Sequence, residues 1–232
     1  MNSQNFKIMF ITDSIGNPRT FPIEEVVPLE MTYPYLIREN YPSAICWQLS
    51  YGNLTTEELV NQAIAYLSDW DPDLIVIQSG INDCRPEAFT EIEKQIVKKS
   101  TGRLFRYFAK HLFNPKVIKW RKVYRVSKKS YKKTLTKFKN IFNKSRILFI
   151  EINVGDGYER ARPGVLKRID DFNEIINEIY PEGLIRVKNK INKYKGLNAD
   201  NIHLNAEGHR VIAELIEKKN ILSMNHPMWM TT

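Results

Sequence analysis

Three polar residues of this chain could together activate a hydroxyl group for attack on a carbonyl carbon. Ser14 supplies the oxygen, His203 a ring nitrogen that can take its proton, and Asp200 lies three residues before the histidine. This spacing can place a carboxylate on one ring nitrogen while the other faces the serine, which fixes the tautomer. Ester hydrolysis through an acyl-enzyme needs such a set and requires no metal or other cofactor. Taken alone, Ser14 is more typical of a helix N-cap than of a nucleophile.

Two further residues could hold the negative charge that develops on the carbonyl oxygen. Gly52 lets a backbone N–H approach this oxygen because no Cβ stands in the way, and Asn82 carries a side-chain NH₂ donor. The N–H of Ser14 could add a third donor. Taken singly, Gly52 is also typical of a tight turn and Asn82 of an Asx-turn after a strand. We expect Asp13 and Asp83 to brace these loops without touching substrate.

Strand and helix patterns alternate along nearly the whole chain. Apolar runs predict strands at 7–11, 44–49, 74–77, 147–152 and 184–187. Caps and helical periodicity predict helices at 32–38, 55–67, 165–179 and 206–218, with His209 in a packing or capping role inside the last. This alternation predicts a doubly wound, mostly parallel sheet. Because sites in such sheets lie at the carboxyl ends of strands, topology brings Ser14, Gly52 and Asn82 together.

The chain resembles the SGNH (GDSL-like) hydrolase family in four short blocks, which in order are Thr12-Asp13-Ser14, Gly52, Gly80-Ile81-Asn82-Asp83 and Asp200-Asn201-Ile202-His203-Leu204-Asn205. The resemblance spans residues 7–215 and implies a flavodoxin-like three-layer α/β/α sandwich. It also implies Ser14 as nucleophile, His203 as base and Asp200 as its partner. The implied oxyanion hole consists of Ser14, Gly52 and Asn82. One departure is Thr12, where the family usually has glycine, because its side chain could crowd the first turn.

Size and composition favour a single domain. With 232 residues, 43% of them hydrophobic, the chain can bury one sizeable core, which we expect over residues 1–222, followed by a tail at 223–232. Cys46 and Cys84 are too few for a disulfide framework and form no CxxC pair. No window reaches the roughly 18 apolar residues of a membrane span. We expect a cytoplasmic protein and leave open a peripheral contact with the inner face of the membrane.

A basic, aromatic-rich segment occupies residues 94–146, with 19 of the 35 Lys and Arg residues and none of the 26 acidic ones. Apolar side chains share a helical face at 105–112 and again at 135–142, which predicts a basic amphipathic helical insertion after Asn82. One interpretation is a cap whose lysines are merely solvated. Another is a cationic lid or membrane-surface contact that favours an anionic or lipid-linked substrate. Nucleic-acid binding is disfavoured, since no motif accompanies the charge.

Three functions are compatible with these residues. The first is a serine esterase acting on O-acyl groups, with O-acetyl groups of a saccharide or lipid-linked glycan as the expected substrate. The second is an O-acyltransferase, because a sugar hydroxyl can replace water in resolving the same acyl-enzyme. The third is a catalytically silent binding protein, against which the intact Ser14, Asn82, Asp200 and His203 argue. The sequence does not separate the first two.

Overall fold

The computed structural model describes residues 5–99, 111–112 and 114–219. Within these residues a sheet of five parallel strands has the order β2-β1-β3-β6-β7. Its strands are β1 (Lys7–Thr12), β2 (Ile45–Ser50), β3 (Leu74–Gln78), β6 (Arg146–Ile150) and β7 (Leu184–Ile185). A separate antiparallel pair consists of β4 (Pro86–Glu87) and β5 (Val123–Tyr124). The predicted mostly parallel sheet is therefore confirmed.

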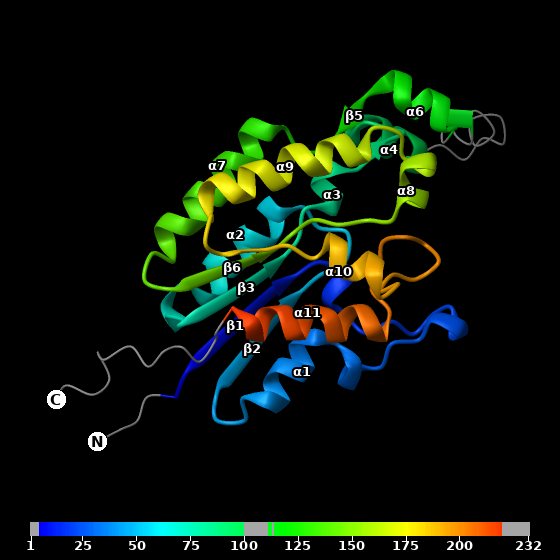
Figure 1. Cartoon of the computed structure of the whole chain (residues 1–232). Helices are drawn as coiled ribbons and strands as arrows, with labels where there is room; N and C mark the ends of the chain where they lie inside the picture. Colours follow the sequence, from blue (N-terminus) through cyan, green and yellow to red (C-terminus); the bar gives the residue numbers. More distant parts are fainter. Residues whose placement is uncertain (1–4, 100–110, 113, 220–232) are drawn as a thin grey trace.

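Helices cover both faces of the sheet (Figure 1). One face carries α1 (Tyr33–Asn40) and α11 (Ala206–Lys218), and the other carries α2 (Thr56–Leu67), α7 (Lys128–Ile141) and α9 (Val165–Ile179). This is the expected three-layer α/β/α sandwich. Further helices, none longer than nine residues, gather at the carboxyl ends of the strands, namely α3 (Ile81–Cys84), α4 (Glu91–Lys99), α6 (Pro115–Arg121), α8 (Asp156–Ala161) and α10 (Lys188–Lys193). The 3₁₀ turns are η1 (Ser14–Gly16), η2 (Ile23–Glu25), η3 (Leu29–Met31) and η4 (Ser68–Trp70).

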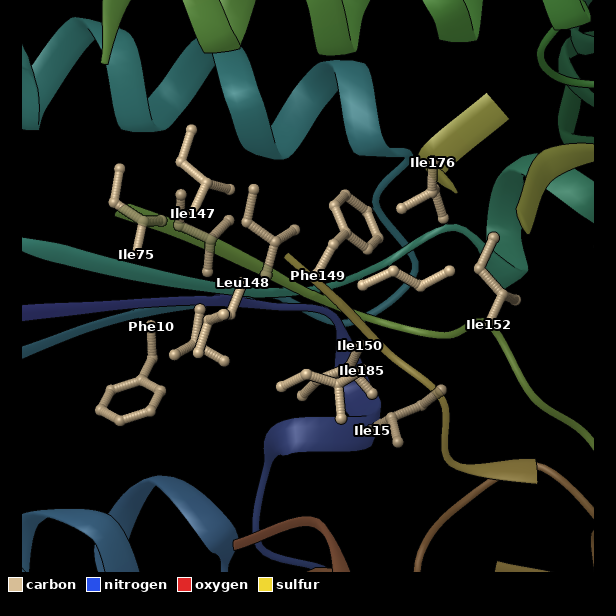
Figure 2. Packing of buried hydrophobic residues seen from close by; sticks show 14 of the residues in the cluster. Phe10, Ile15, Ile75, Ile147, Leu148, Phe149, Ile150, Ile152, Ile176 and Ile185 are labelled. Atoms are coloured by element: carbon tan, nitrogen blue, oxygen red, sulfur yellow. The ribbon is translucent and has the colours of Figure 1, made fainter. Parts of the chain in front are cut away.

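The core lies on both sides of the sheet, which explains the continuous apolar runs of its strands. Every residue of β3 is buried, because helices cover both of its faces. Figure 2 shows Ile147 and Phe149 pointing toward the α2 side, whereas Phe10 and Ile150 point toward the opposite layer. Because successive side chains of a strand point to opposite faces of the sheet, one apolar run contributes to the core on both sides. A chain of this size can thereby support a rigid sheet edge on which loops are positioned.

Two predicted strands end earlier than their apolar runs suggest. The backbone N–H of Ile152 donates to the Asn173 side chain of α9 at 2.9 Å, so β6 leaves the sheet after Ile150. Likewise the N–H of Val187 donates to Glu151 Oε2 at 2.8 Å, and β7 ends at Ile185. In both cases a side chain replaces the neighbouring strand as hydrogen-bond partner, which an apolar pattern does not reveal.

The predicted capping signals are present where helices begin. Thr55 and Glu58 form the reciprocal capping box of α2, as expected from their spacing. The helices predicted at 165–179 and 206–218 are confirmed as α9 and α11. The Asn205 side chain caps α11 by accepting the N–H of Gly208 at 2.9 Å. This cap fixes the point at which the loop containing His203 ends.

The basic segment divides into two structural parts. α7 contacts α2 and α9 and buries Tyr131, Leu135 and Phe138, so it is the crossover helix between β3 and β6. Its lysines lie on the outer face. The part before α7 includes most of α4, the helix α6 and the strand β5, which pairs with β4 outside the segment, and it lies near the carboxyl end of the sheet. The helix expected at 105–112 falls mostly outside the described residues. Of the helices described, none combines the length and apolar character needed to cross a bilayer.

Candidate active site

Ser14 stands at the carboxyl end of β1, which lies between β2 and β3 in the sheet. The strand ends at Thr12, and Asp13 caps the turn η1 by accepting the N–H of Ile15 at 2.9 Å. The fully buried Asp13 therefore holds the first turn in place, while the following serine is only half-buried. A sharp turn directly after a buried strand is the kind of position from which a hydroxyl can face solvent at a sheet edge.

The loop before α11 brings an imidazole and a carboxylate to this serine. His203 Nε2 lies 3.1 Å from Ser14 Oγ, and His203 Nδ1 lies 2.6 Å from Asp200 Oδ2. The loop is closed by Asn198, whose N–H donates to the carbonyl of His203 at 2.8 Å. It is also tied to the β6 side, since the N–H of Gly155 donates to the carbonyl of Asn201 at 2.8 Å. The three predicted residues thus form one continuous chain of contacts, although 189 positions separate Ser14 from His203.

The environment of Asp200 favours its ionised form. Burial raises the pKa of this carboxyl. Hydrogen bonds from the Ile202 N–H and from the ring and N–H of His203 lower the pKa by more than burial raises it, so the pKa lies below its usual value. Both N–H groups donate to Oδ1 at 3.0 Å, which leaves Oδ2 for the ring. An ionised carboxylate at Nδ1 orients the imidazole so that Nε2 can act as a base toward Ser14.

The structure places Gly52 beside the serine. A Cβ built on Gly52 would lie 3.7 Å from Ser14 Cβ, with no other contact within 4 Å. The connection is fixed by the Tyr51 N–H, which donates to the carbonyl of Thr12 at 3.1 Å. Among the described residues, no hydrogen bond is made by the N–H of Ser14 or of Gly52. Both groups therefore remain able to donate to an incoming oxygen.

Asn82 lies in α3, directly after the neighbouring strand β3, and is almost fully buried. Its Nδ2 donates one hydrogen to the carbonyl of Leu54 at 3.0 Å, in the loop that follows Gly52. The amide has two hydrogens, so this bond orients the group and leaves the second hydrogen for another acceptor. The site residues predicted from β1, β2 and β3 thus lie on adjacent strand ends.

The two aspartates expected to brace loops do so. Asp83 accepts both the N–H and the hydroxyl of Thr56, at 2.9 and 3.0 Å, and so ties α3 to the start of α2. Burial raises its pKa to about 6, with the Thr56 bonds acting in the opposite direction. Asp13 is likewise buried, and burial raises its pKa to about 7. In the described residues, neither carboxylate forms a hydrogen bond with the serine hydroxyl or with the imidazole of His203.

Thr12 does not crowd the turn, because Gly16 makes room for it. A Cβ on Gly16 would lie 2.6 Å from Thr12 Oγ1, which is closer than real side chains approach. The Thr12 hydroxyl also lies 2.5 Å from Ser50 Oγ, which links β1 to β2 at the level of the site. The residue that replaces glycine is thus packed and hydrogen-bonded.

The sequence predicted the role of His209 but gave no indication of Arg19. His209 sits within α11 with only 1% exposure, where its Nδ1 accepts the Tyr33 N–H at 3.3 Å, so its predicted packing role is confirmed. Arg19 was missed. Its Nη1 donates to Asp200 Oδ2 at 2.9 Å across 181 positions, and no spacing or motif in the sequence marks it.

A parallel α/β/α sandwich whose strand ends unite a serine, a histidine and an aspartate in hydrogen-bond contact defines the class of serine hydrolases. The chain belongs to the GDSL-like lipase/acylhydrolase family, whose model matches residues 11–211. It is accordingly an SGNH-type ester hydrolase. A comparison with curated proteins gave no match.

Solved structures with the same fold come from several bacteria. A lipase/acylhydrolase from Enterococcus faecalis matches with 16% identity and a TM-score of 0.62, covering 92% of this chain and 94% of that chain. An acetyl xylan esterase variant from Geobacillus stearothermophilus matches with 18% identity and a TM-score of 0.59 over the same shares of the two chains. At these identities the likeness supports the fold alone.

Proposed function

We propose that the protein hydrolyses an O-acyl ester through an acyl-enzyme on Ser14. The observation that carries this proposal is the unbroken contact from Asp200 through His203 to the serine hydroxyl. As the hydroxyl oxygen attacks the ester carbonyl, Nε2 of the imidazole takes its proton and then gives it to the departing alkoxide. A water molecule, deprotonated by the same nitrogen, releases the acid and restores the serine.

The developing oxyanion would be held by three donors on adjacent strand ends. The N–H groups of Ser14 and Gly52 make no other hydrogen bond in the described residues, and Asn82 Nδ2 has one hydrogen left after its bond to Leu54. Preorganised donors of this kind stabilise charge without reorganisation during the reaction. The half-buried position of the serine lets a carbonyl group approach from solvent.

For the substrate we propose O-acetyl groups on a saccharide or lipid-linked glycan. A neighbour of the same fold is an acetyl xylan esterase, which gives a precedent for small acyl groups on sugars within this architecture. The basic segment favours anionic acceptor surfaces, because the exposed lysines of α6 and α7 include Lys116, Lys119, Lys129 and Lys133. We further propose that this face brings the enzyme to an anionic polymer or to the inner face of the membrane.

The activity test uses p-nitrophenyl acetate and a fluorophosphonate probe. The intact protein should hydrolyse the ester and bind the probe covalently, and Ser14→Ala and His203→Ala should each abolish turnover while circular dichroism shows an unchanged fold. Ser68→Ala, at the opposite end of the sheet on η4, serves as the matched serine control. Turnover retained by both site variants would contradict the assigned roles, and a chain that neither hydrolyses nor labels would be a silent binding protein.

The substrate test compares acetylated and longer-chain esters of saccharides, with and without added sugar acceptors. Release of free acetate supports hydrolysis, whereas an acetylated acceptor that accumulates at the expense of free acetate identifies an acyltransferase. Binding to anionic liposomes and to polyanions is measured in parallel at increasing salt. An electrostatic contact should weaken as salt rises, and absence of binding even at low salt would refute it.

A further inference from the structure

The catalytic-loop carboxylate has a second cationic partner besides the imidazole. Asp200 Oδ2 lies 2.6 Å from His203 Nδ1 and accepts a hydrogen bond from Arg19 Nη1 at 2.9 Å. Its other oxygen accepts the N–H groups of Ile202 and His203, each at 3.0 Å. Both oxygens are therefore fully engaged, and the ring shares its oxygen with a guanidinium.

Arg19 is itself held on two sides. Its Nη2 forms an ion pair with Glu25 Oε2 at 2.8 Å, and its backbone pairs with Val27 through two hydrogen bonds of 2.8 Å. The side chains of Arg19 and Glu25 are only 19% and 15% exposed. The second oxygen of Glu25 accepts the N–H of Ala199 at 3.0 Å. Residues 19–27 thus hold the loop 199–203 at two points. Arg19 binds the carboxylate of Asp200, and the carboxylate of Glu25 accepts the N–H of Ala199.

We propose that Arg19 is a positioning residue that fixes the Asp200 carboxylate and, through it, the His203 ring. The inference deepens the proposed function, on which its catalytic consequence rests. A planar guanidinium that spans two carboxylates restrains both, which a point charge on a flexible stem does not. Its positive charge also opposes formation of the imidazolium, because two cations would then share one carboxylate oxygen.

Two carboxylates contact Arg19, and a third lies under the serine. Glu25 and Asp200 are in direct contact with Arg19, and the carboxylate of Asp13 is turned to the Ile15 N–H under the serine. Removal of the arginine therefore changes the charge next to the ring by one unit, with both carboxylates still in place. Two effects then act in the same direction: a cation is lost, and Asp200 becomes free to serve the ring alone.

The test follows the ring itself and the reaction separately. Arg19→Met should raise the midpoint of the His203 imidazole titration, followed by NMR, by on the order of half to one pH unit. The acidic limb of the kcat/KM profile for p-nitrophenyl acetate should move up by the same amount. Above that limb kcat should fall roughly 10-fold, since the base is less well placed. Arg19→Lys should restore the limb but only part of kcat.

Two further variants complete the experiment. Glu25→Gln removes a negative charge from the same cluster and should shift the His203 midpoint downward. Arg38→Met removes an exposed arginine that stacks on Tyr35 and should leave both readouts unchanged. An unshifted midpoint in Arg19→Met and Glu25→Gln, or a fall in kcat with an unmoved limb, would overturn the proposal. If the wild-type chain hydrolyses no ester, the proposed function fails, whereas the NMR titration still decides the role of Arg19.

Discussion

Replacement of Asp13 by asparagine should remove a pH-dependent loss of stability. The Asp13 side chain is fully buried, and burial raises its pKa from 3.8 to about 7, with the Ile15 hydrogen bond opposing and the nearby charge of Asp83 adding to the shift. The unfolded chain therefore ionises at lower pH than the folded one. The folded state is favoured fully only below about pH 4, and this advantage declines until the pH passes about 7.

The size of the effect follows from the two pKa values. A difference of about 3 units corresponds to about 4 kcal/mol, of which about 2–3 kcal/mol falls between pH 5 and pH 8. Asparagine keeps the Oδ1 acceptor for the Ile15 N–H and carries no charge. Its amide would also have acceptors nearby, because a cavity of about 20 Å³ next to Asp13 is lined by Gln78 and Asn153. The oxygens of those two side chains accept no hydrogen bond from the described residues.

The measurement is urea unfolding of wild type and Asp13→Asn between pH 5 and pH 8. The variant should become progressively more stable than wild type as the pH rises, with the gap widening by about 2–3 kcal/mol. Contributions of groups that do not interact with Asp13 are common to both curves and cancel in the difference. Asp69→Asn, on the exposed turn η4, is the control and should follow wild type. Parallel curves for wild type and Asp13→Asn would show that Asp13 is not kept neutral by burial.

Three further outcomes are expected. Asn82→Ala should lower kcat by on the order of 10²–10³ with little change in KM, measured with p-nitrophenyl acetate; an unchanged kcat would remove Asn82 from the oxyanion hole. Gly16→Ala should lower the free energy of unfolding by about 1–3 kcal/mol, because the added Cβ would lie 2.6 Å from Thr12 Oγ1. The double variant Gly16→Ala with Thr12→Gly should recover most of this loss in thermal unfolding. Equal losses in the single and the double variant would argue against the clash. Burial lowers the pKa of His209 to about 4, so His209→Gln should remove a loss of stability that wild type shows as the pH falls from about 6.5 to 4; a variant with the wild-type acid profile would contradict this.

The sequence predicted best those elements in which the apolar pattern repeats over many residues. α9 has the predicted bounds because its buried apolar residues repeat on one face along the whole helix, from Val165 to Ile179. In α11, Val211, Ile212 and Ile216 share one buried face in the same way. α10 was not predicted, since only Ile191 of its six residues is buried and the rest are polar. The two-residue strands β4 and β5 are likewise too short to show alternation.

The site was predictable where strand topology decides it. Ser14, Gly52 and Asn82 each follow a strand, and adjacent parallel strands place their ends at one edge whatever their separation in sequence. Arg19 and Glu25 could not be found in this way. They lie in an irregular segment whose course depends on contacts with residues 199–200, and such pairings leave no periodic trace in either segment.

The packing of Thr12 against Gly16 has a consequence for how relatives of this chain are recognised. The side chains at these two positions would occupy the same space beside the turn that begins at Ser14, so only one of the two positions can carry a side chain of this size. A chain with glycine at the first position is free to carry a side chain at the second, and the reverse arrangement is the one found here. A motif that requires glycine at the position of Thr12 therefore excludes such chains. A motif that accepts glycine at either this position or that of Gly16 includes them.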